Sequence, residues 1–376
     1  MNWQKIKAEI PTSPAFILNE DNIIANLQPL QQLRHETGCK ILYSMKALPL
    51  GALLELLKNE IDGISASSLF EAKLAAEVLQ GKGSVHLTTP GLRSDEFAEL
   101  SSLCSHISFN SLTQFRQLAL QGRKNYSIGL RINPKLSFAD DARFDPCRRH
   151  SKLGVAIGSV CDGLPSSVEG LHVHTVFARE DFLPLTATLN AIWPLLEQAK
   201  NLKWLNLGGG YLFSKIHGFE PLISTLNELR QRFALDIYLE PGKAIVGNAG
   251  YLLTTVLDRF ESDGKTLIVL DTSVNHNPEV FEYQRQPLLL EHEPNSSSSA
   301  LLVGSTCLAG DLFGEYCFGA LPDVGDRLVF ADVGAYSLIK ANRFNGYNLP
   351  AIYTTRNGQF RMVKNYDYEA YYRQWI

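Results

Sequence analysis

Eight short runs of β-branched and aliphatic residues alternate with longer segments of helical period between residues 41 and 242. This alternation is typical of strand–helix units whose strands pair side by side in a parallel sheet. Eight units in about two hundred residues predict a closed (β/α)8 barrel within an α/β chain. The predicted strands are ILYSMK (41–46), GISAS (63–67), VHLTTP (85–90), HISFN (106–110), IGLRINP (128–134), GLHVHT (170–175), WLNLGG (204–209) and DIYLEPG (236–242).

The segments between these runs carry apolar residues at intervals of three and four, as helices that cover a sheet do. They include LGALLELLKNE, SSLFEAKLAAEVLQ and NSLTQFRQLALQG, and the last two begin at Ser or Asn residues that can cap a helix. The connection from residue 134 to residue 169 is too long for one strand–helix unit. We therefore expect it to make an excursion close to the functional site rather than to form a plain helix.

A different pattern begins after Gly242, where strand-like runs are separated by turn-forming residues. The runs are YLLTTVL, TLIVLD, ALLVGS, DRLVFADV, PAIYTT and FRMVKN, and the segment EHEPNSSSSA predicts a solvated loop among them. We therefore predict two domains. Residues 20–242 form the barrel, and residues 1–19 and 243–376 form a β-rich domain of sandwich-like or barrel-like form.

Charge and cysteine spacing exclude several classes of partner. The chain has 35 basic and 39 acidic residues, a net charge of -4 and no dense Lys/Arg block, so we expect no nucleic acid partner. Neither the first twenty residues nor any later segment has the apolar run of a signal or a membrane span, so we expect no membrane partner. The six cysteines lack metal-ligand spacing, which predicts no metal and reduced thiols in a cytoplasm.

The candidate site follows from the barrel, because the active sites of such barrels lie at the carboxyl ends of the strands. The residues that end the predicted strands include Lys46, His174, the Gly208–Gly210 turn, Glu240 and Gly242. A lysine, a histidine, a carboxylate and a glycine turn that converge on one mouth indicate a chemical site rather than a generic surface.

Three of these features also have a plain structural interpretation, which the sequence leaves open. The Lys46 amine can extend from a strand end to water, or it can be partly desolvated and reactive in Schiff-base chemistry. The Gly208–Gly210 turn can offer backbone amides to an anion or can serve only as a tight turn. Glu240 can hold a pyridine nitrogen protonated, or it can pair with a structural Arg131.

Two further candidates are equally open. His172 and His174 alternate along one predicted strand and share a face, where either can be structural or catalytic, and as a metal pair they lack a third ligand. Cys307 in GSTCLAGDLFGEYCF can be a reactive thiol or a small buried hydrophobe.

A series of motifs along the chain resembles a known enzyme family. The motifs are SPAFILNEDNI, YSMKAL, GISASSLFEAKLA, ISFNS, RINP, RRHSKLGV, GLHVHT, LNLGGGY, YLEPG, DTSVNHNPEVFEYQ, CLAGDLFGEY and GAYSLIKANRFNG. Together they resemble the fold-type III decarboxylases that depend on pyridoxal 5'-phosphate (PLP), the alanine-racemase-like group. CLAGDLFGEY and NRFNG point to the branch that acts on carboxynorspermidine and carboxyspermidine. The resemblance therefore implies formation of norspermidine or spermidine in polyamine biosynthesis.

The resemblance also implies roles for the candidate residues. Lys46 would carry the cofactor through a Schiff base, His174 would stack on its pyridine ring and Glu240 would contact its ring nitrogen. The implied phosphate ligands are Gly208, Gly209, Gly210, Gly242 and Tyr336. Cys307 would return a proton to the decarboxylated carbon. Because the implied substrate is a polycation, its distal amines need carboxylates, and the candidates there are Asp311, Glu279 and Glu315, with His276 as a weaker neighbour.

In this family the counterparts of Cys307 and Asp311 enter from the partner subunit, so the resemblance implies a homodimer with shared active sites. Two departures stand out. EPGK replaces the EPGR of many relatives, so Lys243 supplies a point charge without the bidentate fork of arginine. The segment HVHTVFARE lacks the Asn-Cys that often follows the second histidine in this branch. Open alternatives are a related decarboxylase acting on diaminopimelate, ornithine or a modified diamino acid, and a PLP-binding protein without turnover.

Overall fold

The computed structural model describes residues 3–119, 121, 125–139 and 141–376. The chain divides into two compact units, one formed by Asn26–Ala244 and the other by the residues up to Ala25 together with Ile245–Ile376. Helix α2 (Glu20–Thr37) crosses the first boundary and helix α9 (Lys243–Val246) crosses the second. The first unit is therefore one continuous segment of the chain, and the second unit is formed by the segments that precede and follow it.

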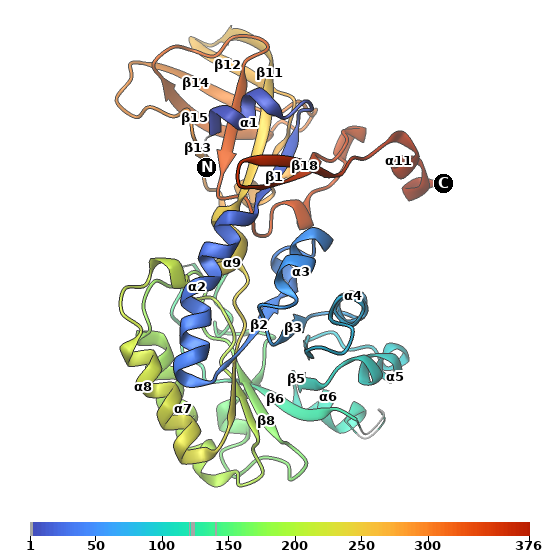
Figure 1. Ribbon diagram of the computed structural model, residues 1–376, viewed down its shortest axis with the longest axis vertical. Coiled ribbons are helices and arrows are strands. Elements are labelled where there is room, and N and C mark those ends of the chain that lie inside the picture. Colours follow the sequence, from blue (N-terminus) through green and yellow to red (C-terminus); the bar gives the residue numbers. More distant parts are fainter. Residues whose placement is uncertain (1–2, 120, 122–124, 140) are drawn as a thin grey trace. The chain divides into compact units, whose positions relative to one another are not determined.

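The first unit is built around a parallel sheet that closes on itself (Figure 1). Among the described residues, eight of its strands follow the order β5-β4-β3-β2-β10-β9-β8-β6, and a β5–β6 pairing completes the circle. These strands are β2 (Lys40–Ser44), β3 (Gly63–Ala66), β4 (Ser84–Thr88), β5 (His106–Phe109), β6 (Ser127–Asn133), β8 (Gly170–Val173), β9 (Trp204–Asn206) and β10 (Asp236–Leu239). The short β7 (Val155–Ala156) pairs with the end of β6. The predicted eight-stranded barrel is confirmed.

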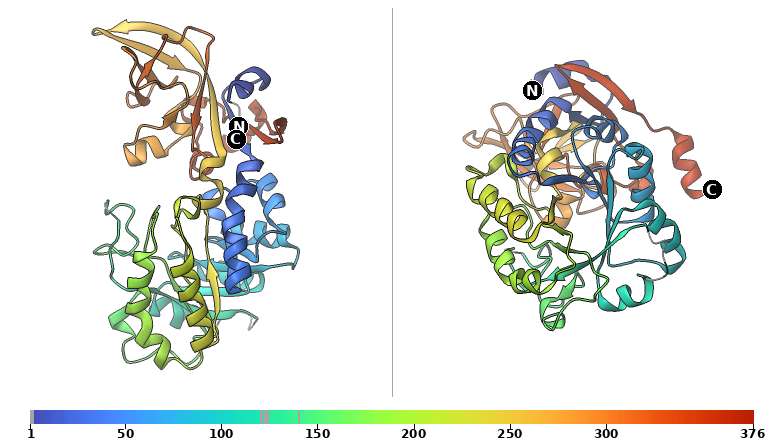
Figure 2. Two further views of the ribbon diagram at one scale, coloured as in Figure 1. Left: turned by 60° about the vertical axis from the view of Figure 1, so that its left-hand side comes forward. Right: turned by 60° about the horizontal axis from the view of Figure 1, so that its bottom comes forward.

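Helices surround these strands on the outside (Figure 2). Besides α2, they are α3 (Gly51–Leu57), α4 (Leu69–Leu79), α5 (Ser94–Leu103), α6 (Leu112–Leu118), α7 (Leu183–Gln198) and α8 (Glu220–Phe233). Ser68 and Ser111 cap α4 and α6, because their hydroxyls accept the backbone N–H groups of Glu71 and Gln114 at 3.3 and 3.1 Å. Both caps were expected from the sequence, although residues 120 and 122 of the predicted segment NSLTQFRQLALQG lie outside the described residues.

Polar side chains occupy much of the barrel interior. Buried polar residues alternate along the strands with aliphatic residues that face the helices, as the two-residue period of a strand requires. The buried polar set includes Ser65, His86, Ser108, Arg131, His172, Asn206 and Glu240. Barrels of this kind are usually filled by branched aliphatic side chains, so a polar interior indicates that chemistry, not packing alone, shapes these positions.

The second unit contains a mixed sheet in the order β15-β14-β12-β11-β1-β17-β18, with β16 pairing to β11 and β13. The strands are β1 (Ala15–Asn19), β11 (Gly250–Ser262), β12 (Lys265–Leu270), β13 (Leu288–Leu289), β14 (Ser298–Val303), β15 (Leu312–Phe318), β16 (Arg327–Ala331), β17 (Ala351–Arg356) and β18 (Gln359–Lys364). A register shift between Val256 and Asp258 lets β11 pair with β1 and β16 along its first half and with β12 along its second. Helix α1 (Trp3–Glu9) contributes Ile6 to the apolar cluster beneath.

Two sequence expectations for this unit need correction. The segment EHEPNSSSSA is not a loop throughout, because β14 begins at Ser298 and pairs with β12 and β15. Backbone pairing on both sides supports this strand although its first residues are serines. Strand β15 was also missed, since its first five residues belong to the motif CLAGDLFGEY and the strand lacks a plain alternation of apolar residues. Among the described residues, no helix has both the length and the hydrophobicity that a membrane crossing needs.

Candidate active site

Lys46 lies in a short 3-10 turn, η1 (Met45–Ala47), directly after β2. The strand predicted to end at Lys46 ends instead at Ser44, whose N–H donates to the carbonyl of Pro241 at 3.1 Å. Met45 and Ala47 are fully buried on either side, while the Lys46 side chain is exposed to a cavity at the barrel mouth. The turn therefore holds the lysine in place and directs its side chain into this cavity.

The surroundings of Lys46 favour its neutral form. Desolvation by the enclosing barrel lowers the pKa of the Lys46 amine, and the positive charge of Arg131 acts in the same direction. The carboxylates of Glu240 and Glu71 oppose this effect without reversing it. A lysine with a lowered pKa is the type of amine that can attack a carbonyl carbon at neutral pH.

Glu240 is a buried anion at the same mouth. It follows β10, its side chain is 6% exposed, and its N–H donates to the carbonyl of Gly208 at 2.8 Å. One carboxylate oxygen accepts from Asn206 Nδ2 at 2.8 Å, and the other lies 3.4 Å from His172 Nε2. Burial alone would raise the pKa of Glu240, but His172, Lys46 and Asn206 outweigh it and hold that pKa well below its usual range.

The Glu240 contacts decide between the two roles considered for this residue. Within the described chain, its partner at ion-pair distance is His172 and not Arg131. Arg131 is 9% exposed, lines the cavity and influences Glu240 only through its charge. Glu240 therefore forms no ion pair with Arg131 in the described chain.

The Gly208–Gly210 turn is required by sterics, and its amides are less open than the sequence suggested. Gly208 and Gly210 have φ values of +66° and +96°, and a Cβ on Gly209 would lie 2.1 Å from the carbonyl oxygen of Glu240. The N–H of Gly208 donates to Asn206 Oδ1 at 2.8 Å, and the N–H of Gly209 donates to His174 Nδ1 at 3.1 Å. Two of the three amides of this turn therefore already have acceptors within the barrel.

His174 follows β8 and lines the cavity with Lys46. Its Nδ1 accepts the Gly209 N–H, so the remaining proton of a neutral ring sits on Nε2. Burial and the charges of Lys46 and Arg131 hold the pKa of His174 well below its usual value. The His174 ring is thus neutral, its orientation is set by the Gly209 N–H, and it lines the same cavity as Lys46. Gly242 packs nearby, since a Cβ there would lie 3.1 Å from the Cβ atoms of Ser44 and Ala47.

The cavity at this mouth has a volume of about 360 Å³. The expected excursion after β6 lines it through Arg143, Phe144, Asp145, Pro146, Arg148, Ser151, Lys152 and Leu153. Phe144 stacks on Phe177 with ring centroids 5.2 Å apart, and both rings line the cavity. Phe177 belongs to the segment HVHTVFARE, in which the sequence departs from the branch it resembles. Phe144 was not predicted as a site residue, because no periodicity or motif in the sequence marks it. Residue 140 of the excursion lies outside the described residues.

In the second unit, Asp311 is a buried support for its own loop. It is 4% exposed, and its carboxylate accepts the N–H groups of Val274 and Thr306 at 2.8 and 3.1 Å, as well as the Thr306 hydroxyl. His276 is 3% exposed, and its Nδ1 lies 3.0 Å from the Thr272 hydroxyl. Burial lowers the pKa of His276 to about 4, opposed by Asp311. His276 Nε2 has no hydrogen-bond partner among the described residues.

Cys307 lies on the surface of this unit at the tip of the same loop. Its N–H donates to Asn345 Oδ1 at 2.8 Å, and the Tyr347 hydroxyl donates to the carbonyl of Ser305 at 2.7 Å. The motifs CLAGDLFGEY and NRFNG, which are separate in sequence, thus lie against each other. The thiol is exposed rather than buried, so Cys307 is not a core hydrophobe.

The other predicted residues of the second unit fall into two places. Glu279 contacts the Tyr283 hydroxyl, and burial together with Glu279 raises the pKa of Tyr336 to about 12. Glu315 instead lies on the exposed side of β15, where it forms an ion pair with Lys265 at 2.5 Å. The alternation of β15 points Glu315 away from the buried side, so the structure gives no support for its predicted role at a substrate site.

The fold and the site geometry define a class of protein: a (β/α)8-barrel enzyme that has a desolvated lysine beside a buried carboxylate at the barrel mouth. Comparison with known proteins gives the family. A model described as "Pyridoxal-dependent decarboxylase, C-terminal sheet domain" matches residues 30–334. The chain therefore belongs to the pyridoxal-dependent decarboxylases, which are carboxy-lyases, and the resemblance seen in the sequence is confirmed. In the described residues, no cluster of three or more His, Cys, Asp or Glu side chains could hold a metal ion.

Several relatives match over nearly their full length. The chain is 36% identical to a carboxyaminopropylagmatine decarboxylase of Synechocystis sp., over 96% of this chain and 94% of that one. It is 32% identical to a carboxynorspermidine/carboxyspermidine decarboxylase of Campylobacter jejuni, over 99% of both. A crystal structure of carboxynorspermidine decarboxylase with norspermidine, from the same species, superposes with a TM-score of 0.87 at 29% identity, covering 97% of this chain and 100% of that one.

Proposed function

We propose that this chain decarboxylates a carboxylated polyamine, with carboxynorspermidine and carboxyspermidine as the leading substrates and norspermidine and spermidine as products of polyamine biosynthesis. The near-full-length similarity to decarboxylases named for these substrates supports the substrate class. The single observation that carries the chemistry is the Lys46 amine, which is biased toward neutrality and stands at a cavity beside the anion of Glu240.

The residues at the barrel mouth fit PLP. Lys46 is placed to hold an aldehyde carbon, the buried Glu240 carboxylate can accept a hydrogen bond from a protonated ring nitrogen, and the neutral His174 ring can cover one face of a pyridine. Because the Gly208 and Gly209 amides have acceptors in the barrel, Gly210 and Gly242 are the better candidates of the two glycine turns for the phosphate. Tyr336 stays a prediction from the resemblance.

When bound, the cofactor supplies the electron sink that makes loss of CO2 from an amino acid possible. The chain's residues prepare that step. Lys46, whose lowered pKa favours the neutral amine, can be replaced by the substrate amine at the cofactor's aldehyde carbon. Anionic Glu240 keeps a proton at the ring nitrogen, and His174 shields one ring face from water. Cys307 Sγ then delivers a proton to the carbon that has lost CO2.

A second candidate substrate is carboxyaminopropylagmatine, which the relative with 36% identity is named for. It ends in a planar guanidinium, whereas carboxynorspermidine ends in an ammonium, and the two groups need different acceptor geometry. In the described second unit, the Asp311 oxygens are already occupied by Val274 and Thr306. We therefore rank Glu279 and His276 above Asp311 as contacts for the distal end and omit Glu315.

The test is CO2 release from the purified protein reconstituted with PLP. It should be measured in parallel with carboxynorspermidine, carboxyspermidine, carboxyaminopropylagmatine and diaminopimelate, and kcat/KM compared. A preference for one of the first three, with diaminopimelate poor, supports the proposal. Turnover of diaminopimelate alone, or no turnover of any, contradicts it.

We further propose a homodimer in which Cys307 serves the barrel of the partner subunit. Its exposure on the second unit supports this arrangement. The inactive variants Lys46→Ala and Cys307→Ala should then restore activity when mixed, because one site of each mixed dimer has both residues intact. Statistical mixing predicts about a quarter of the wild-type activity. No recovery, with mixed dimers shown to form, would mean that each chain supplies both residues to its own site.

A further inference from the structure

His172 lies on β8 in the barrel interior, two residues before His174, which follows that strand. Its side chain is 2% exposed, and its Nε2 lies 3.4 Å from the Glu240 carboxylate. Neither Nδ1 nor Nε2 has a hydrogen-bond partner among the described residues, so the 3.4 Å approach of Nε2 to Glu240 is an electrostatic contact rather than a formed hydrogen bond. A buried histidine that makes no other polar contact has only one group to act on, and that group is Glu240.

Both oxygens of Glu240 are contacted from within the barrel. Asn206 Nδ2 donates to one at 2.8 Å, and His172 Nε2 faces the other. The Asn206 side chain is itself oriented, because its Oδ1 accepts the Gly208 N–H at 2.8 Å. An ionised carboxylate has about four acceptor positions, so these two contacts fix its plane and leave positions for a third donor.

We propose that His172 is a positioning residue, which orients the Glu240 carboxylate and keeps it ionised toward the cofactor ring nitrogen. This inference rests on the proposed function, in which Glu240 meets that nitrogen. His172 itself touches neither cofactor nor substrate.

The electrostatic surroundings decide how His172 acts. The titratable and charged groups that face it are Glu240, Arg131, Lys46, His174 and His86. Burial lowers the pKa of His172 and the Glu240 carboxylate opposes this, but the charges of Arg131 and Lys46 add to the lowering, so the net shift favours the neutral ring. Nε2 must then carry the proton, because an unprotonated Nε2 would place a lone pair against the carboxylate. His172 is thus a neutral donor rather than a counter-ion.

This distinction yields a specific set of variants. His172→Gln keeps a neutral N–H donor, whereas His172→Leu removes the donor and leaves Glu240 more desolvated. His106→Gln is the matched control, because His106 is also a histidine of the barrel interior but stacks on His86 at 4.0 Å. Circular dichroism and thermal unfolding of each variant establish that it is folded.

The readouts are the absorbance band of bound PLP and the PLP dissociation constant, both followed from neutral to acid pH. Loss of an N–H donor that faces a charged group should move the acid-side midpoint of the band upward by about one pH unit or more in His172→Leu. The expected kcat falls about tenfold or more, with little change in KM. His172→Gln should restore most of both, and His106→Gln should behave like wild type.

An unchanged acid midpoint and kcat in folded His172→Leu would overturn the inference while leaving the proposed function intact. Failure of the proposed function gives a different result, because it is seen in the wild type: absence of bound PLP would overturn both proposals, whereas turnover of diaminopimelate alone would overturn the proposed substrate and leave the acid midpoint of bound PLP as the test of His172. A midpoint that moves equally in His106→Gln would assign the effect to general barrel stability and would also overturn the role of His172.

Discussion

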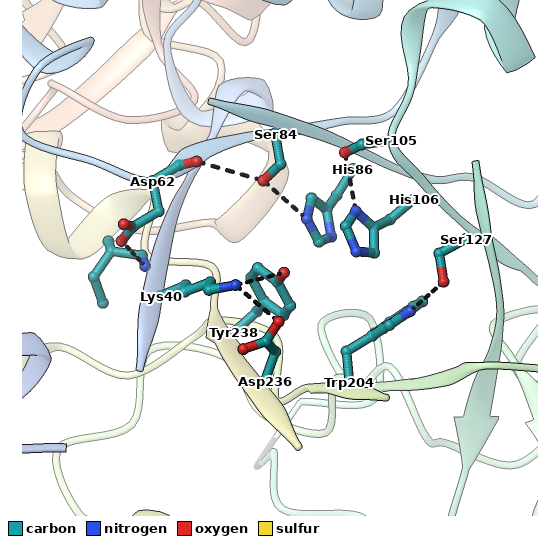
Figure 3. Close-up of polar contacts among 11 residues, drawn as sticks. Lys40, Asp62, Ser84, His86, Ser105, His106, Ser127, Trp204, Asp236 and Tyr238 are labelled. Atoms are coloured by element: carbon teal, nitrogen blue, oxygen red, sulfur yellow. Dashed lines mark hydrogen bonds and ion pairs between the residues drawn. The ribbon is translucent and has the colours of Figure 1, made fainter. Parts of the chain in front are cut away.

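The two ends of the barrel carry similar side chains but differ in what those side chains contact. At the floor, where the strands begin, His86 and His106 stack with centroids 4.0 Å apart, and Trp204 and Tyr238 pack around them (Figure 3). At the mouth, where the strands end, Lys46, His174 and Glu240 line or adjoin an open cavity. Histidine, lysine, carboxylate and aromatic residues are present at both ends.

Polar groups of the floor cluster find partners within it. Lys40 donates to Asp236 at 2.8 Å, Trp204 Nε1 donates to the Ser127 hydroxyl at 2.8 Å, and Tyr238 lies beneath the Lys40 ammonium. Burial lowers the pKa of His106 to about 4, so a shifted pKa occurs here as well as at the mouth. A shifted pKa therefore marks burial at either end, and only the cavity and the strand direction distinguish the chemical site.

The largest expected effect comes from replacing the lysine at the mouth, and the matching replacement at the floor is its control. Lys46→Ala should lower kcat by about a thousandfold and abolish the PLP absorbance band, because the Lys46 amine lines the cavity and its lowered pKa suits it to Schiff-base chemistry. Lys40→Ala at the floor should leave both unchanged, since its amine pairs with Asp236. Spectra and CO2 release measure the two variants together. Equal losses in both would erase the distinction between mouth and floor.

The carboxylates give the next contrast. Glu240→Gln should lower kcat by about a hundredfold or more and weaken PLP binding less, because the neutral amide cannot hold a ring nitrogen protonated. Asp236→Asn breaks a half-exposed ion pair and should cost less than about 1 kcal/mol of stability. Steady-state kinetics and urea unfolding provide the comparison. A Glu240→Gln variant with wild-type kcat would remove Glu240 from its assigned role.

At the floor, an added methyl group should lower the stability of the protein without changing its catalytic activity. A Cβ on Gly170 would lie 1.9 Å from the Trp204 indole, so Gly170→Ala should destabilise the protein by about 1–3 kcal/mol. The control is Gly51→Ala, because a Cβ on Gly51 meets nothing within 4 Å. Urea unfolding gives the loss, and kcat per folded molecule should stay at the wild-type value. An unchanged unfolding midpoint in Gly170→Ala would mean that Trp204 does not seal the floor as tightly as the structure shows.

The last contrast concerns a pH dependence of stability that arises from a floor histidine and is lost gradually rather than in one step. The folded pKa of His106 is about 4, below the usual 6.5, so the unfolded chain binds its proton first as pH falls. Stability is therefore complete above about pH 6.5 and declines toward pH 4, by up to about 3 kcal/mol from this residue. His106→Asn should flatten that decline in urea unfolding measured across the range. The groups that face His106 are His86, Lys40, Asp236 and Glu169.

The comparison also shows what the sequence can and cannot predict. The barrel was predictable because each strand carries a β-branched or aliphatic run between helical segments, and strand ends point to one mouth. The end of β2 at Ser44 was not, because the turn that holds Lys46 depends on a hydrogen bond to Pro241, nearly two hundred residues away in the chain. The use of the Gly208 and Gly209 amides by Asn206 and His174 is likewise a contact that no local pattern encodes.

Residues within one element were predicted better than residues that depend on a neighbour. His174 and Glu240 follow from their strand positions, but the link between His172 and Glu240 crosses from β8 to the end of β10. Asp311 was assigned through its motif, and only the structure shows that Val274 and Thr306 occupy its oxygens. Glu315 was assigned in the same way, and only the structure shows that its side chain lies on the exposed side of β15, a strand that was not predicted, and pairs with Lys265.

The central claim is that Lys46 is the residue that holds the cofactor. Protein reconstituted with PLP can be reduced with borohydride, which makes a covalent lysine adduct permanent, and then mapped by peptide mass spectrometry. The pyridoxyl group should be found on the peptide containing Lys46 and on no other. Modification of a different lysine, such as Lys243, or absence of an adduct from protein that retains bound PLP, would contradict it.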